Sequence, residues 1–207
     1  GKDDYTVSGD AKATNVGTYT LTVNGTGNFT LSASKDWKIQ AVTDNKWTVE
    51  PSVTNCTYGK KPTVTMGRAK FGTDTETVEY FKDGKSLGND VPTNAGDYRA
   101  VFTVAKTGNY NGVSKTVDFT IAKAPLTVTA NPKTITYGEK PDNNGVTYSG
   151  FVKDEKEDVL EGELTYAYDY QQYGNVGSYE ITIDGLTSGN YDITFTKGTL
   201  TVEQKNV

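Results

Sequence analysis

A five-residue motif recurs three times along the chain at nearly constant spacing, and this repetition constrains the fold more than any other feature of the sequence. The motif is Asn-x-Gly-x-Tyr, and it begins at Asn15, Asn94 and Asn175, with offsets of 79 and 81 residues. A second motif follows each copy and reads Gly27-Asn28-Phe29, Gly108-Asn109-Tyr110 and Gly189-Asn190-Tyr191. Two motifs that recur together at one offset indicate a tandem array of small repeats.

A third landmark divides the array into repeats. Tyr58-Gly59 begins eleven residues after the start of Trp47-Thr48-Val49, and Tyr137-Gly138 begins eleven residues after the start of Leu126-Thr127-Val128. No Tyr-Gly pair precedes the first motif. We therefore predict that the chain starts with the C-terminal half of a truncated repeat and continues with two complete ones. The predicted boundaries are 1–43 for the first repeat, 44–123 for the second, 124–204 for the third and 205–207 for a tail.

The connection between the second and third repeats is very short. Residues 121–126 pass from one expected strand almost directly into the next, with Pro125 between them. Proline has no N–H, so we expect Pro125 to end the hydrogen-bond ladder and stiffen the joint. A joint this short predicts an elongated, semi-rigid array.

Within a repeat, apolar residues alternate with polar ones, as in a strand with one buried face. Tyr98, Ala100, Phe102 and Val104 fall on one face after the second motif, and the first and third copies follow the same pattern. The motif resembles the corner before strand F of immunoglobulin-like sandwiches, where a tyrosine hydroxyl bonds to upstream backbone. The structural residues predicted from the landmarks are Gly17, Tyr19, Tyr58, Gly96, Tyr98, Pro125, Tyr137, Gly177 and Tyr179.

The fold class that these patterns predict is all-β. We expect small immunoglobulin-like β-sandwich repeats, each with six or seven short strands. A β-grasp-like unit is the alternative, because residues 150–160 allow one short helix that crosses a sheet.

The third repeat also resembles a known family. Ala124–Ala130 and Lys133–Gly138 are similar to the opening of MBG repeats of the YGX type, and later segments up to Val202 continue the resemblance. Residues 44–123 resemble bacterial immunoglobulin-like repeats. The resemblance implies a secreted or cell-wall-attached bacterial surface protein, often an adhesin, and therefore an extracellular location. These families share no catalytic residues.

Composition argues against several classes of function. The net charge is −5 without a cluster of Lys and Arg, which disfavours nucleic-acid binding, and no apolar run is long enough for insertion into a membrane. The chain has no histidine, which removes Ser-His-Asp catalysis and histidine-containing metal sites. Carboxylates gather at residues 154–163, but interleaved lysines favour a solvated loop or one-turn helix over a calcium site. We predict no enzyme activity, no cofactor and no metal.

Tyrosines on one expected strand offer the remaining candidate site. Tyr166, Tyr168 and Tyr170 share a face, and Tyr173 follows. Exposed tyrosines stack on sugar rings and donate hydrogen bonds, whereas the same stripe facing inward is core. The prediction is a non-catalytic stalk whose partners are neighbouring repeats. The alternative is a module that binds a host glycan or surface protein through Tyr168, Tyr170 and Tyr173.

Overall fold

The computed structural model describes residues 4–206, and over this range the chain is all-β, as predicted. It forms nineteen strands and one turn of 3₁₀ helix. Residues 4–206 include no helix with the length and hydrophobicity that a membrane span requires. The chain divides into two compact units, and the division passes through the second repeat. One unit comprises residues 1–52, 64–79 and 100–117, and the other comprises residues 53–63, 80–99 and 118–207.

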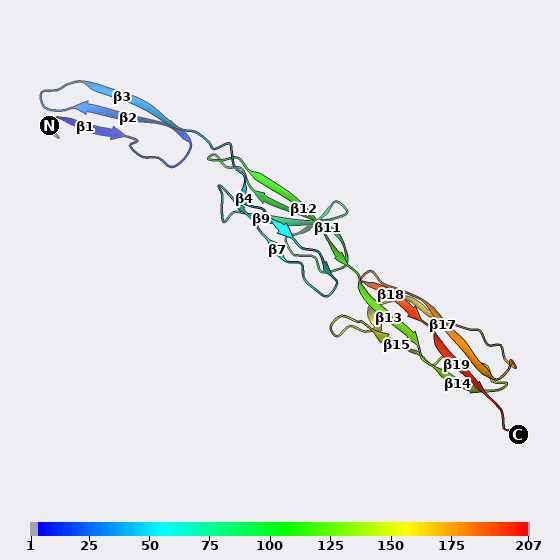
Figure 1. Cartoon of the computed structure of the whole chain (residues 1–207). Helices are drawn as coiled ribbons and strands as arrows, with labels where there is room; N and C mark the ends of the chain where they lie inside the picture. The colour runs from blue at the N-terminus through cyan, green and yellow to red at the C-terminus, as the bar shows by residue number, and fades with distance from the viewer. Residues whose placement is uncertain (1–3, 207) are drawn as a thin grey trace. The chain divides into compact units, whose positions relative to one another are not determined.

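The first repeat is a single antiparallel sheet. Its strands are β1 (Tyr5–Gly9), β2 (Gly17–Gly25) and β3 (Ser32–Ile39), with β2 in the centre (Figure 1). Tyr19 lies against Trp37 with ring centroids 4.9 Å apart, yet no residue from 4 to 43 is buried. The expected core face of Tyr19, Leu21 and Val23 is therefore only half covered, because this repeat has no second sheet to pack against.

The second repeat combines one five-stranded sheet with two short strand pairs. The sheet order is β10-β9-β11-β12-β6, and the pairs are β4-β8 and β5-β7. Residues Tyr98, Ala100, Phe102 and Val104 of β11 are all buried and alternate with more exposed ones, which confirms the predicted period of two. The strands are β4 (Trp47–Val49), β5 (Ser52–Val53), β6 (Cys56–Thr57), β7 (Val64–Thr65), β8 (Arg68–Ala69), β9 (Thr77–Lys82), β10 (Lys85–Gly88), β11 (Gly96–Val104) and β12 (Val113–Ala122).

The third repeat is a seven-stranded sandwich of two sheets, ordered β15-β13-β18 and β14-β19-β17-β16. Both sheets contribute to one core, in which Leu126 and Val128 from the first sheet pack with Ile181, Leu200 and Val202 from the second. This arrangement matches the sandwich prediction. The strands are β13 (Ala124–Ala130), β14 (Lys133–Thr136), β15 (Val146–Ser149), β16 (Glu161–Tyr168), β17 (Gly177–Thr187), β18 (Tyr191–Thr196) and β19 (Gly198–Glu203).

Two stretches of the third repeat change sheet together. The chain passes from β13 to β14 and from β18 to β19, and each change moves it to the opposite sheet. The pairs β13–β18 and β14–β19 are both parallel. The helix that a β-grasp unit needs between residues 150 and 160 is absent from the described chain, where only the 3₁₀ turn η1 (Glu157–Val159) forms.

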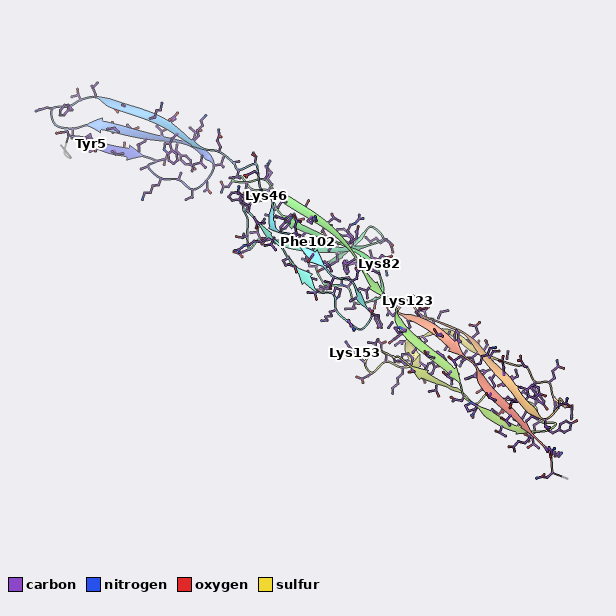
Figure 2. The ribbon with its side chains drawn as sticks, viewed as in Figure 1. Tyr5, Lys46, Lys82, Phe102, Lys123 and Lys153 are labelled. Atoms are coloured by element: carbon purple, nitrogen blue, oxygen red, sulfur yellow. The ribbon has the colours of Figure 1, made fainter. Side chains whose placement is uncertain are left out.

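Pro125 corrects one prediction. It does not end the ladder, because β13 begins at Ala124 and Pro125 pairs with Asp192 of β18. The missing N–H is tolerated because β15 pairs with β13 only from Thr127 onwards. The linker itself is as short as expected, since Lys123, labelled in Figure 2, is the only residue between β12 and β13.

Candidate functional site: the repeat junctions

All three tyrosines of the Asn-x-Gly-x-Tyr motif make the predicted corner. Each tyrosine hydroxyl donates a hydrogen bond to the backbone carbonyl of the motif asparagine four residues upstream. The oxygen–oxygen distances are 2.6 Å for Tyr19–Asn15, 2.8 Å for Tyr98–Asn94 and 2.7 Å for Tyr179–Asn175. The bond fixes the asparagine backbone, so the next N–H and the asparagine side chain are held in one orientation.

The second motif builds a turn that presents another asparagine. In the second repeat, Thr107 Oγ1 accepts bonds from the N–H groups of Asn109 and Tyr110, at 3.2 and 3.3 Å. In the third repeat, Ser188 Oγ accepts from Asn190 and Tyr191 in the same way, at 3.1 and 3.2 Å. A hydroxyl that satisfies two backbone donors holds the turn without using the asparagine side chain. That side chain is free to bond elsewhere.

At the first junction, the turn of the second repeat meets the motif of the first. Asn109 Oδ1 accepts from the Val16 N–H at 2.8 Å, and Asn109 Nδ2 donates to Asn15 Oδ1 at 3.1 Å. We call this arrangement the asparagine pair. The linker takes part as well, because the Val42 N–H donates to the Asn109 carbonyl at 2.8 Å. All of these residues belong to one compact unit.

The second junction repeats this chemistry with equivalent atoms, inside the other unit. Asn190 Oδ1 accepts from the Ala95 N–H at 2.9 Å, and Asn190 Nδ2 donates to Asn94 Oδ1 at 3.4 Å. Ala124, the first residue of β13, donates its N–H to the Asn190 carbonyl at 2.9 Å. The two sequence motifs are thus the two halves of a junction: Asn-x from one repeat and the Gly-Asn-Tyr turn from the next.

The two asparagine pairs differ in burial. Ala95 is 8% exposed, whereas Val16 is 38% exposed. A buried N–H that loses its acceptor has no water to replace it, so the second pair is the more costly one to break.

The second junction has an additional contact through a carboxylate. Glu155 accepts hydrogen bonds from the hydroxyls of Tyr58, at 2.7 Å, and of Tyr191, and the two tyrosine rings meet edge to face at 5.5 Å. The Tyr191 hydroxyl also accepts a hydrogen bond from the Val152 N–H at 2.8 Å. Glu155 is therefore half-buried and engaged, which corrects the prediction of a solvated acidic loop at this one residue.

Both tyrosines at this contact resist ionisation. Burial, followed by the bond to Glu155, raises the pKa of Tyr191 to about 12. The bond to Glu155, followed by burial, raises the pKa of Tyr58. The hydroxyls remain protonated donors through the physiological range, which the shared carboxylate requires.

The backbone conformation and close packing at position 59 explain why a glycine follows Tyr58. Its φ is +88°, and a Cβ added there would lie 2.3 Å from Val152 Cγ1. Gly138 in the third repeat has φ +92°. Both glycines of the Tyr-Gly landmark hold a left-handed conformation that L side chains rarely adopt.

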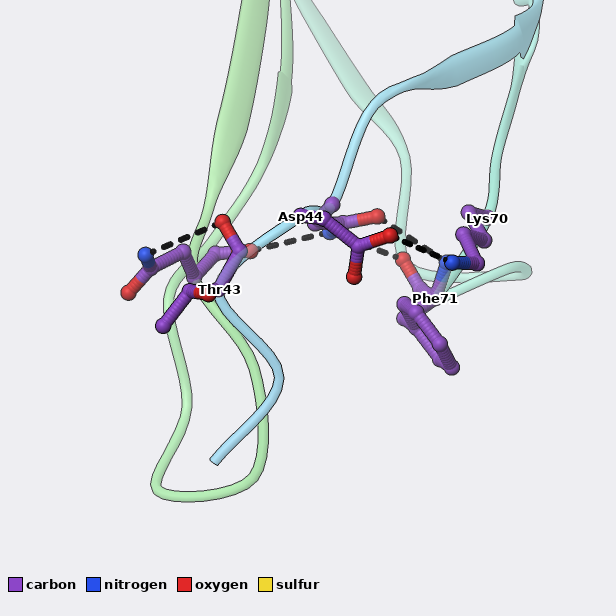
Figure 3. A network of polar contacts seen from close by, with 6 residues as sticks. Thr43, Asp44, Lys70 and Phe71 are labelled. Atoms are coloured by element: carbon purple, nitrogen blue, oxygen red, sulfur yellow. Dashed lines mark hydrogen bonds and ion pairs between the residues drawn. The ribbon is translucent and has the colours of Figure 1, made fainter. Parts of the chain in front are cut away.

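A separate polar network holds the linker of the first junction (Figure 3). Asn45 Nδ2 donates to the carbonyls of Phe71 and Asn111, and Asn45 Oδ1 accepts the Phe71 N–H at 3.0 Å. Asp44 pairs with Lys70 at 2.6 Å, and this bond is the main cause that lowers the pKa of Asp44. Three backbone groups are satisfied by one amide, so the linker is tied to the second repeat along its length.

The structure does not bring the candidate binding tyrosines together on one open face. Tyr170 is 4% exposed and belongs to the core, while Tyr168 is half-buried and packs against that core. Tyr173 is 68% exposed. Tyr170 therefore cannot stack on a sugar in this conformation, and the predicted three-tyrosine patch reduces to Tyr173.

The single cysteine of the chain, Cys56, has ordinary surroundings. Cys56 is half-buried on β6 beside Ile121, and burial raises the pKa of its thiol. Over residues 4–206, no three side chains of the metal-ligating acid and thiol types gather at one point. Sequence reasoning missed the asparagine pairs and the role of Glu155. The regular spacing of the two motifs was a signal for the asparagine pairs.

One part of the chain matches a known protein family. Residues 126–201 match the family model described as MBG domain (YGX type), which confirms the resemblance inferred for the third repeat. Residues 1–125 lie outside that match. No curated protein sequence matches the chain.

Solved structures give only distant similarity. Drosophila N-cadherin EC1-4 is 11% identical with a TM-score of 0.31, and the match covers 93% of this chain and 59% of that one. The first three domains of the bacteriophage RB49 outer capsid protein Hoc are also 11% identical, with a TM-score of 0.28 and coverage of 98% and 88%.

Proposed function

We propose that this chain is a non-catalytic spacer, or stalk, in a secreted or cell-wall-attached bacterial surface protein. In this role the repeats separate a binding region from the cell surface. The observation that carries the proposal is the asparagine pair, which joins consecutive repeats twice with equivalent atoms. The match of residues 126–201 to the MBG family supports the same role.

The chain segments that lead into the second and third repeats support this role, because each one pairs as a strand with the repeat that it enters. Val42 forms a parallel bridge to Tyr110, and Ala124 pairs in parallel with Tyr191. A linker whose backbone is hydrogen-bonded to the next repeat has few torsions left to act as a hinge. Each junction is thereby restrained by side-chain and backbone bonds together.

The strand order of the third repeat also suits a protein under tension. The early strands β13 and β14 run parallel to the late strands β18 and β19. A pull on the two ends of the repeat loads these ladders along the strand direction, so that many hydrogen bonds resist together instead of opening one after another. Resistance to forced unfolding depends on the unfolding rate, which such an arrangement keeps low.

Small-angle scattering of the full chain tests the proposal. A compact globule of this length has a radius of gyration of about 17 Å. We expect a value at least half as large again, together with the circular dichroism of a folded β protein. The variant with both Asn109→Ala and Asn190→Ala is the matched control, and its distance distribution should broaden. A radius close to that of the compact globule would refute the stalk.

A further inference from the structure

The third repeat carries the same junction half that the first and second repeats use, but here it faces outward. Asn175 and Val176 stand at the positions of Asn94 and Ala95, and the Tyr179 corner holds them in the same way. Ala95 is 8% exposed beneath Asn190, whereas Val176 is 44% exposed. The exposed residue is apolar, and it occupies the motif position at which the Ala95 N–H donates to Asn190 Oδ1 in the second junction.

A second part of the same surface corresponds to the tyrosine contact of the second junction. The Tyr58 N–H donates to the Ala122 carbonyl at 2.8 Å, and the Tyr137 N–H donates to the Glu203 carbonyl at the same distance. Tyr137 therefore leaves the end of its sheet as Tyr58 does. Tyr58 is half-buried against Tyr191, but Tyr137 is 42% exposed.

An open hollow adjoins this tyrosine. Its volume is about 460 Å³, and Tyr137, Gly138, Glu139, Tyr173 and Lys205 are among the residues that line it. Tyr173 approaches Tyr137 edge to face at 6.5 Å, which extends the aromatic surface. The hollow lies where the equivalent tyrosine of the second repeat receives an aromatic ring and a carboxylate.

We propose that Tyr137, Gly138, Asn175 and Val176 form a docking surface for one further repeat of the third repeat's kind. That partner carries a Ser-Gly-Asn-Tyr turn and a glutamate equivalent to Glu155. Its asparagine accepts a hydrogen bond from the Val176 N–H and donates one to Asn175 Oδ1. Its tyrosine packs against Tyr137, and its carboxylate accepts a hydrogen bond from the Tyr137 hydroxyl.

The choice of partner follows from the two junctions inside the chain. Both use an asparagine held by a Ser/Thr-Gly-Asn-Tyr turn, and the second adds the shared carboxylate. A neutral sugar supplies neither an aromatic ring nor a carboxylate, whereas the third repeat already supplies the amide, the ring and the acid together at the second junction. The inference does not depend on the stalk proposal, because a further repeat docks by this chemistry whether or not the array bears load.

The test uses an extended chain in which residues 1–204 are followed by a second copy of residues 124–207. Gln204 aligns with Lys123, so Ala124 of the added copy follows in the register of the natural junction. The added copy carries Val176→Ile, which distinguishes its peptides by mass. Hydrogen–deuterium exchange is then measured for the original peptide containing Val176, and the peptide containing Ala95 serves as the internal reference.

We expect exchange at Val176 to slow at least about fivefold relative to the unextended chain. The matched control, Asn190→Ala in the added copy alone, should restore the faster rate. Unchanged exchange at Val176, with Ala95 protected in the same molecule, would overturn the proposal. Protection that appears in the unextended chain as its concentration rises would also overturn it, because the occupant would then be a second molecule.

A disulfide measurement keeps the test decisive if the added copy folds poorly. In a Cys56→Ser background, Asn175→Cys is combined with Asn190→Cys in the added copy. The pair Asn94→Cys and Asn190→Cys in the unextended chain is the positive control. A disulfide in both proteins supports docking, and a disulfide in the control alone contradicts it.

Discussion

Replacing Asn190 with alanine is the sharpest test of the junction. The substitution removes the acceptor of the Ala95 N–H and the donor to Asn94 Oδ1. It leaves the turn intact, because Ser188 Oγ and not Asn190 satisfies the turn's backbone donors, and Asn190 is not among the described residues with positive φ. Any loss therefore reports on the junction itself.

The magnitude follows from burial. The contact to Asn94 is long, at 3.4 Å, and contributes little. The Ala95 N–H is the larger loss, since a donor in a residue 8% exposed costs about 1–3 kcal/mol when it is left without an acceptor. The equivalent change Asn109→Ala frees the N–H of Val16, which is 38% exposed, so water replaces the bond and the cost is about 0.5–1 kcal/mol.

Hydrogen exchange read residue by residue by NMR measures both losses. Asn190→Ala should accelerate exchange of the Ala95 amide by about 5-fold to 150-fold, and Asn109→Ala should accelerate Val16 by about 2-fold to 5-fold. Each variant is the control for the other, because the untouched junction should keep its rate. Equal acceleration at the two amides would show that burial does not set the strength of the pairs, and no acceleration at Ala95 would show that the pair does not restrain the junction.

Three further predictions concern stability. Because the folded chain raises the pKa of Tyr191 to about 12 from the ordinary 10, its contribution is complete below pH 10 and is lost as pH rises towards 12; Tyr191→Phe should flatten this alkaline loss in urea unfolding. Gly59→Ala should destabilise by about 1–3 kcal/mol more than Gly84→Ala, because both glycines have positive φ but only Gly59 meets Val152, and equal losses by urea unfolding would contradict this. Leu200→Ala should cost about 2–5 kcal/mol by calorimetry, since Leu200 is fully buried in the sandwich core.

The features of the fold that depend on local pattern were predictable from the sequence. The alternation along β11 and the three tyrosine corners depend on residues a few positions apart, and both are present in the structure. The expected core face of the first repeat failed for a different reason. Leu21 and Val23 alternate correctly, but alternation records which face is apolar and not whether another sheet covers it.

The site was harder to predict because its partners come from different repeats. Glu155 sits among lysines and other acids, a pattern typical of solvated loops, and nothing within its own repeat shows that Tyr58 lies beside it. Tyr170 shows why the pattern left two interpretations open. Its period-two neighbours are compatible with an exposed stripe and with a core-facing one. The structure agrees with the second, because Tyr170 is buried and packs edge to face on Tyr179 at 5.1 Å.

The junction is directional, and this property explains the constant spacing of its two motifs. In each asparagine pair one repeat contributes Asn-x and the other contributes the turn, so the interface is head to tail and not two-fold symmetric. Head-to-tail interfaces do not close on themselves unless the rotation between units permits it, and otherwise they extend indefinitely. An insertion between the motifs would shift one half of the junction relative to the other. The offsets of 79 and 81 residues keep the two halves in place for both junctions of this chain.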